Sequence, residues 1–335
     1  MPSLRRCSIT VFAFIFLFGL AALASAKTVD FTFAHFIPPN EPGAEVGLWL
    51  EKDLNQKMKG QVKAKYFHSG QMGNGIEIVK KVRMGTLKGA FLTGNYAPEL
   101  NPKFGIGTLA YCMDSYAKWE AFLKNKGLRT ELFTCLESKG LLVLDMCYFG
   151  TYGFATTKPV QTLDDLKSFK MRTTQARYPL AFWNALGVNP VPMAWGAVFP
   201  ALKQGVVDGT DQTENVTRLR LADVCKYYTR TKHMVGLFFL VVNKKWWNSL
   251  DDNLRSSMDA IIRENVAKAR QASVDLTEKA PEALKAKGVK VMDLSPDEMA
   301  KFKASQKSVW KKFESEIGRE WLTKVSDLAA GTEAQ

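Results

Sequence analysis

Arg172 and Trp195 are the residues of this chain whose types and positions most clearly indicate binding chemistry. Arg172 ends a short predicted strand, and Trp195 stands at the start of a predicted helix. An arginine offers a planar set of N–H donors that matches a carboxylate with two parallel hydrogen bonds, and it keeps its charge. From the residues alone, two alternatives stay open: a surface arginine, or one paired with Asp164 or Asp165, with Trp195 packed in the core.

The elements around these two residues have the pattern of a parallel α/β layer. Strand, helix, strand, helix and strand are predicted over residues 170–173, 176–186, 188–193, 197–205 and 206–209. The two prolines of the middle strand suit the edge of a sheet. In such a layer the carboxyl ends of the strands face the ligand crevice, so we expect Arg172 to face it.

Several motifs occur along the chain in a fixed order. ALGVNPVPM (residues 185–193) and ALKQGVVDG (201–209) flank Trp195, and FHSGQMG (67–73), VRMGTL (82–87) and TLDDLK (162–167) precede them. Together with Arg172, these motifs make the chain similar to the extracytoplasmic solute-binding proteins of the tripartite ATP-independent periplasmic (TRAP) transporters. The resemblance covers nearly all of the chain after its leader.

This resemblance implies an α/β fold with the two-lobed periplasmic-binding-protein (Venus flytrap) architecture. Lobe I is expected to contain residues 27–149 plus about 238–277, and lobe II residues 150–237 plus about 278–335, with the ligand cleft between them. A helix predicted from residue 250 to about 287 ends at Gly288. At ~1.5 Å per residue it would exceed about 50 Å, which is enough to span both lobes.

The resemblance also assigns roles in the cleft. It implies that Arg172 binds the carboxylate of the ligand, that Trp195 packs on the ligand, and that Gln175 reaches it with an amide. Many relatives have a second arginine where this chain has Tyr152. We therefore expect neutral donors from Tyr152 and Gln212 to assist Arg172.

Three further candidates carry less specific signals. Asp211 either accepts a hydrogen bond from a ligand hydroxyl or amine or helps to hold a metal, and direct contact is the preferred interpretation. His35 follows the first strand and is either a cleft residue or an ordinary loop histidine. Thr93 ends a predicted strand that begins at Lys88.

Catalytic patterns are weak in this sequence. The three histidines, His35, His68 and His233, are far apart and lack the spacing of a metal-hydrolase site. No G-x-S-x-G motif surrounds Ser69. We therefore predict a protein that is not an enzyme and that uses no cofactor and no metal.

The first residues have the pattern of a secretory signal. Arg5 and Arg6 precede an apolar run over residues 9–23, and Ala24-Ser25-Ala26 is a suitable cleavage site, so residues 1–26 are predicted to be a signal peptide. Cleavage would leave a net charge of +11, from +13 less two arginines, spread over many helices. These features predict a periplasmic protein without nucleic-acid partners and without membrane insertion after cleavage. Of the five cysteines, four would remain after cleavage, Cys112, Cys135, Cys147 and Cys225, and they allow three disulfide pairings or none.

The predicted function is periplasmic binding of a small organic acid by lobe closure. The resemblance implies delivery to the small and large membrane subunits of a TRAP transporter. Two alternatives remain: a ligand-sensing binding protein for a receptor kinase, and an exported enzyme acting on an anionic substrate, for which no nucleophile and base are evident.

Overall fold

The computed structural model describes residues 28–333, so the predicted signal peptide, residues 1–26, lies outside the described part of the chain. The strands are β1 (Val29–Ala34), β2 (Val62–Phe67), β3 (Gly89–Thr93), β4 (Leu141–Thr156), β5 (Met171–Thr173), β6 (Val191–Pro192), β7 (Gly209–Thr213), β8 (Tyr227–Arg230), β9 (Val235–Asn243) and β10 (Lys290–Asp293).

The α-helices are α1 (Val46–Lys57), α2 (Gly75–Arg83), α3 (Ala97–Leu100), α4 (Tyr116–Lys124), α5 (Lys126–Thr134), α6 (Leu163–Leu166), α7 (Arg177–Ala185), α8 (Val198–Lys203), α9 (Glu214–Val216), α10 (Lys244–Asn248), α11 (Asp252–Lys285), α12 (Pro296–Ser305), α13 (Lys307–Ile317) and α14 (Arg319–Glu333). Shorter helical turns are η1 (Pro102–Gly107), η2 (Glu137–Lys139), η3 (Trp195–Ala197) and η4 (Thr217–Leu221).

Two lobes share one sheet, whose strands follow the order β2-β1-β3-β9-β4-β7-β5-β6. In lobe I, β1 pairs in parallel with β2 and β3, and β9 runs antiparallel between β3 and β4. In lobe II, β5 pairs in parallel with β6 and β7, which confirms the parallel layer predicted around Arg172. The proline-containing β6 lies at the end of the strand order, as predicted.

Strand β4 connects the lobes without a break over 16 residues. Its first part pairs with β9, and its second part pairs with β7 and β8. The pairing with β9 shifts register between Tyr148 and Gly150, where Gly150 has a φ of 126°. An L-residue rarely adopts this φ, so glycine permits the irregularity at the point where the strand passes between the lobes. The predicted boundary near residues 149–151 is thus a bulge inside a strand.

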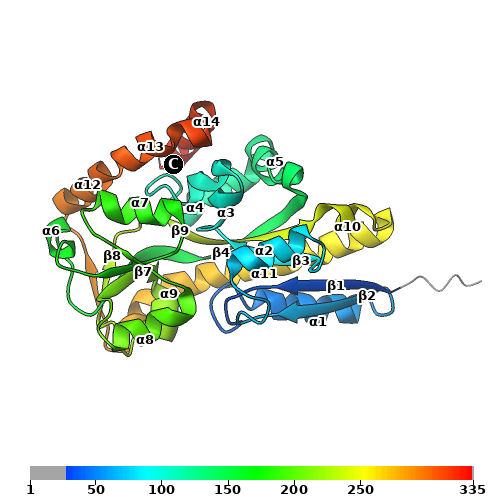
Figure 1. Ribbon diagram of the computed structural model, residues 1–335, viewed down its shortest axis with the longest axis horizontal. Helices are drawn as coiled ribbons and strands as arrows, with labels where there is room; N and C mark the ends of the chain where they lie inside the picture. Colours follow the sequence, from blue (N-terminus) through cyan, green and yellow to red (C-terminus); the bar gives the residue numbers. More distant parts are fainter. Residues whose placement is uncertain (1–27, 334–335) are drawn as a thin grey trace, which may run out of the picture.

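Helix α11 has 34 residues, from Asp252 to Lys285, and corresponds to the long helix predicted from the sequence. The side chain of Asp251 accepts a hydrogen bond from the backbone N–H of Leu254 and caps its start. The helix packs along β4 and also contacts α1 of lobe I and β10 of lobe II. It therefore lies across both lobes, as Figure 1 shows.

The last three helices also cover both lobes. Phe302 of α12 is buried in the core of lobe II with Phe154 and Trp183, whereas Trp321 of α14 is buried in a core of lobe I with Phe122. The expected division assigns residues 278–335 to lobe II, but these apolar side chains place α14 against α4 of lobe I (Figure 1).

Within residues 28–333, none of the helices combines the length and the apolar character needed to cross a bilayer.

Candidate ligand site between the lobes

A cavity with an empty volume of about 540 Å³, its open mouth included, lies between the lobes. Lobe I supplies residues from the loop after β1, from the segment after β3, and from β4 and β9. Lobe II supplies the ends of β4, β5 and β7 together with η3 and α9. The lining residues are Phe36, Ile37, Glu41, Pro42, Thr93, Asn95, Tyr96, Phe149, Tyr152, Arg172, Thr174, Trp195, Gln212, Val216 and Phe238.

Arg172 reaches this cavity from β5 and is only 5% exposed. Its Nε and Nη2 atoms donate to the carbonyl oxygen of Met193, at 3.2 and 2.9 Å. Within residues 28–333, no carboxylate oxygen lies within 4.0 Å of the guanidinium. Burial lowers the pKa of Arg172, and nearby Asp211 opposes that effect. A buried cation with no carboxylate in direct contact favours the entry of an anion.

Trp195 lies on the opposite lobe from Glu41 and bridges the cleft. The Cζ atom of Arg172 is 5.7 Å from the centre of the indole ring, within the range of a cation–π contact. The indole Nε1 donates to Oε1 of Glu41 at 3.2 Å. The ring also packs against buried clusters of both lobes, so it forms a flat apolar wall between a cation and a carboxyl group.

Glu41 is the acidic residue of the cavity lining. It lies in the loop after β1, is 3% exposed, and has its Oε1 atom 3.3 Å from Nε of Arg220. Burial raises the pKa of Glu41 from 4.5 to about 7, although the hydrogen bond from Trp195 and the charge of Arg220 lower it. Near neutral pH this carboxyl group therefore exchanges a proton easily.

Neutral polar groups complete the lining. Tyr152 lies beside Arg172, and burial raises the pKa of its phenol above the usual range, so the group remains a neutral hydrogen-bond donor and acceptor. The hydroxyl of Thr93 is buried without a hydrogen-bond partner in the described chain. Gln212 uses its side-chain oxygen to accept from the backbone N–H of Thr213 at 2.8 Å, which leaves its amide NH₂ as a donor.

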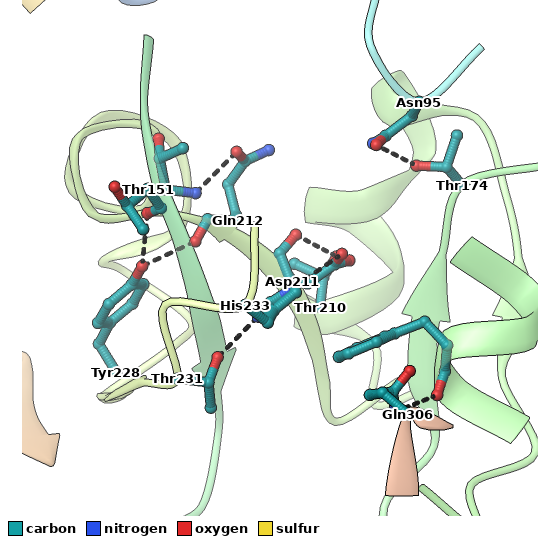
Figure 2. A network of polar contacts seen from close by, with 12 residues as sticks. Asn95, Thr151, Thr174, Thr210, Asp211, Gln212, Tyr228, Thr231, His233 and Gln306 are labelled. Carbon is teal, nitrogen blue, oxygen red and sulfur yellow. Dashed lines mark hydrogen bonds and ion pairs between the residues drawn. The ribbon is translucent and has the colours of Figure 1, made fainter. Parts of the chain in front are cut away.

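The lobes touch across the mouth of the cavity. Nδ2 of Asn95 in lobe I donates to Oγ1 of Thr174 in lobe II at 3.4 Å, as Figure 2 shows. Nε of Arg177 on α7 lies 3.3 Å from Oε2 of Glu99 on α3. Together with the contact between Trp195 and Glu41, these bonds hold the two lobes close together over the cavity.

The structure brings five of the eight predicted site residues to the cavity: Thr93, Tyr152, Arg172, Trp195 and Gln212. The other three, Gln175, Asp211 and His35, are not part of the lining.

Each of these three has a different setting. Gln175 is exposed, and its neighbour Thr174 faces the cavity instead. Asp211 is buried behind Arg172, with its Oδ2 3.8 Å from Nε2 of His233 (Figure 2). His35 is fully buried against the ring of Phe238, and burial lowers its pKa to about 3. Asp211 and His35 thus support the walls of the site and do not form its surface.

The residues that the sequence analysis did not identify are mainly Glu41, Asn95 and Thr174. A signal for Glu41 exists: it is the one charged residue in the loop over residues 36–43, between Asn40 and Pro42. Asn95 and Thr174 each follow a predicted strand at its carboxyl end, where cleft residues are expected.

Two further expectations concern metal and cysteine chemistry. Among the residues that the structure describes, no three His, Cys, Asp or Glu side chains are grouped so that they could hold a metal ion. Cys112, Cys135, Cys147 and Cys225 are all free thiols. Burial raises the pKa of Cys112 to about 12, so this thiol is poorly reactive at neutral pH.

Comparisons with known proteins agree with this architecture. The C4-dicarboxylate-binding periplasmic protein DctP of Rhodobacter capsulatus is 24% identical over 315 residues, covering 93% of this chain and 94% of its own. The 2,3-diketo-L-gulonate-binding periplasmic protein YiaO of Escherichia coli is 26% identical over 241 residues, covering 71% of this chain and 73% of its own.

Solved structures share the fold. The sugar acid binding protein DctPAm of Advenella mimigardefordensis, in complex with galactonate, has a TM-score of 0.85 at 23% identity and covers 91% of this chain and 99% of its own. A TRAP periplasmic solute-binding protein of Shewanella oneidensis with bound succinate has a TM-score of 0.84 at 19% identity. The match covers 90% of this chain and 99% of that protein. These neighbours confirm the predicted two-lobed α/β architecture.

The family described as bacterial extracellular solute-binding protein, family 7, matches residues 33–316. This range contains both walls of the cavity and the motifs that resemble TRAP solute-binding proteins. The chain therefore belongs to family 7 of the bacterial extracellular solute-binding proteins.

Proposed function

We propose that this protein binds a small organic acid in the cleft, with one carboxylate of the ligand on Arg172. The observation that carries the proposal is the buried guanidinium, which faces the cavity and has no ion-pair partner in the described chain. Each hydrogen bond to an ionised group contributes about 1.5 to 3 kcal/mol, so a carboxylate would stabilise the closed cleft considerably. The names of the relatives support the class, since dicarboxylates, a diketo sugar acid and a sugar acid are all organic acids.

The arrangement of the lining explains how binding and lobe closure are coupled. Arg172 and Trp195 belong to lobe II, whereas Glu41 and Thr93 belong to lobe I. A ligand that touches all four groups contacts both lobes at once. Ligand contacts of this kind exist only in the closed form, so binding shifts the population toward closure by hinge motion.

We further propose that the closed protein delivers its ligand to the small and large membrane subunits of a TRAP transporter and that it acts in the periplasm. The family is one of extracellular solute-binding proteins, which supports both statements. The protein is not proposed to be an enzyme. Within the described chain, the one carboxyl group of the cavity lining is that of Glu41, and no Ser, Cys or His accompanies it there.

A thermal-shift screen followed by calorimetry tests the proposal. The screen includes monocarboxylates, dicarboxylates, keto acids, sugar acids and amino acids. A ligand at ~100 times its Kd stabilises the folded state by about 2.7 kcal/mol, which is easily detected. Binding of an organic acid that is lost in Arg172→Met is the expected result. No binding of any carboxylate, or binding unaffected by this substitution, would contradict the proposal.

A further inference from the structure

Glu41 and Arg172 lie at two ends of one wall of the cavity. The indole of Trp195 has Cζ of Arg172 at 5.7 Å from its ring centre and donates through Nε1 to Glu41 at 3.2 Å. A small ligand that lies flat on this ring with its carboxylate on Arg172 therefore directs its other end toward Glu41. The two charged side chains of the lining come from different lobes, so only a ligand in the closed cleft meets both.

The carboxyl group of Glu41 is not saturated by its protein partners. Both the indole N–H of Trp195 and the guanidinium of Arg220 approach the same oxygen, Oε1. The second oxygen, Oε2, has no hydrogen-bond partner within the described chain. A carboxyl oxygen in this position accepts a hydrogen bond from a hydroxyl or an amino group of a ligand.

A second ligand carboxylate at this end of the cavity would lie next to the carboxyl group of Glu41 and would be repelled when that group is ionised. The lining holds one permanent cation, Arg172, and one acidic side chain, Glu41. Arg220 also approaches Glu41, but its side chain is 42% exposed and its charge is already directed at that carboxyl group. Like charges in a buried site repel each other, and the repulsion excludes the ligand that carries the extra charge.

We propose that Glu41 is a specificity-determining residue that selects monocarboxylates bearing a hydroxyl or amino group at the far end and rejects dicarboxylates. This inference rests on the proposed function, because it requires the ligand carboxylate to lie on Arg172. It goes further in naming the ligand subclass and the residue that discriminates within it.

The discrimination depends on pH because Glu41 titrates near neutrality. The groups that interact with it are Arg220 from η4, the indole N–H of Trp195 and the phenol of Tyr152, whereas Arg172 and Tyr96 line the same cavity. Burial raises the pKa of Glu41 to about 7. At pH 8 the ionised group repels a second carboxylate, whereas at pH 6 the protonated group donates a hydrogen bond to it. Rejection of dicarboxylates is therefore strongest above pH 7.

Calorimetry with matched ligand pairs tests this inference. The pairs are succinate with succinamate and 4-hydroxybutyrate, glutarate with 5-aminovalerate, and galactarate with galactonate. At pH 8, we expect at least one donor-bearing monocarboxylate to bind tenfold or more tightly than its dicarboxylate partner. In Glu41→Gln this ratio should fall below about threefold, mainly because the dicarboxylate binds better. Glu264→Gln removes the same charge from an exposed position on α11 and should leave the ratio unchanged.

The remaining outcomes distinguish a failure of the role proposed for Glu41 from a failure of the proposed function. If no donor-bearing monocarboxylate binds wild type more tightly than its dicarboxylate partner at pH 8, or if the ratio is unchanged in Glu41→Gln, the role of Glu41 is overturned. Both variants, Glu41→Gln and Glu41→Ala, are checked for folding by circular dichroism. If they are folded but lose affinity equally for monocarboxylates and dicarboxylates, Glu41 only holds the lobes together, and its role in specificity is overturned. If no carboxylate binds, or if binding survives Arg172→Met, the proposed function itself fails.

Discussion

Replacing Arg172 by methionine should separate ligand binding from folding. Methionine retains an unbranched apolar stem and removes the planar donor group. In the protein, that group donates twice to the carbonyl of Met193 and otherwise faces the cavity. The substitution thus removes the proposed ligand anchor together with one local contact.

The expected loss of affinity is large. Truncating one member of a buried, hydrogen-bonded charge pair costs about 2 to 5 kcal/mol. Since about 1.4 kcal/mol corresponds to a tenfold change, the Kd should rise roughly 30-fold to several thousandfold. Arg172→Lys keeps the charge without the planar fork, so we expect an intermediate loss.

The expected loss of stability is small. Leaving the Met193 carbonyl without its donors costs about 1 to 3 kcal/mol if that oxygen stays buried. Removing a desolvated guanidinium that has no carboxylate partner offsets part of this cost. We therefore expect the free energy of unfolding without ligand to fall by less than about 2 kcal/mol.

Two measurements on the same samples test this reasoning. Calorimetry with the organic acid that binds wild type gives the Kd, and urea unfolding followed by tryptophan fluorescence gives the free energy of unfolding. Arg83→Met is the matched control, because Arg83 is exposed on α2 and carries the same charge. The reasoning is refuted if Arg172→Met binds within threefold of wild type, or if it unfolds so easily that its binding defect reflects lost structure.

Three further changes have expected outcomes. Trp195→Phe keeps an aromatic wall but removes the hydrogen-bond donor to Glu41. Ligand affinity measured by calorimetry should therefore fall by about tenfold, or ~1.4 kcal/mol. Unchanged affinity would show that this hydrogen bond does not support closure of the lobes. Because burial raises the pKa of Glu41 from 4.5 to about 7, the unfolded chain loses this proton at lower pH than the folded chain does. Wild type should therefore lose up to about 3 kcal/mol relative to Glu41→Gln between pH 4.5 and 7.5 in urea unfolding, and a constant difference would contradict the shift. Gly150→Ala would place a Cβ 3.0 Å from the Cβ of Thr213 at a φ of 126°. The free energy of unfolding should therefore fall by about 1 to 3 kcal/mol. An unchanged midpoint of urea unfolding would be incompatible with this backbone geometry.

Local signals in the sequence predicted much of lobe II. The sequence alone predicts a capping box of Thr162 with Asp165 and an N-cap of Ser295 before Pro296, because capping depends only on neighbouring residues, and both are present in the structure. Other boundaries depend on tertiary context. The sequence pattern over residues 115–138 predicts a single helix. The structure divides this segment into α4 and α5 at Asn125, whose side chain caps α5 by accepting from the backbone N–H of Leu128.

The part of the candidate site that lies within one motif was the most directly predictable. Arg172 and Trp195 are separated by a short segment with a recognisable pattern, and both reach the cavity. Glu41 lies far from them in the sequence and meets Trp195 only after the lobes have packed together. Gln175 is exposed, whereas its neighbour Thr174 lines the cavity just after the end of β5. Sequence spacing does not determine which side chain turns inward at the end of a short strand.

The central position of β9 also determines when lobe I can fold during synthesis. Strand β9 lies between β3 and β4 in the sheet, yet it ends at Asn243, long after both of its partners. Until that strand leaves the ribosome, both β3 and β4 lack a neighbour, and the core of lobe I stays open. Because these pairings join segments far apart in the chain, the sheet of lobe I is completed late in synthesis.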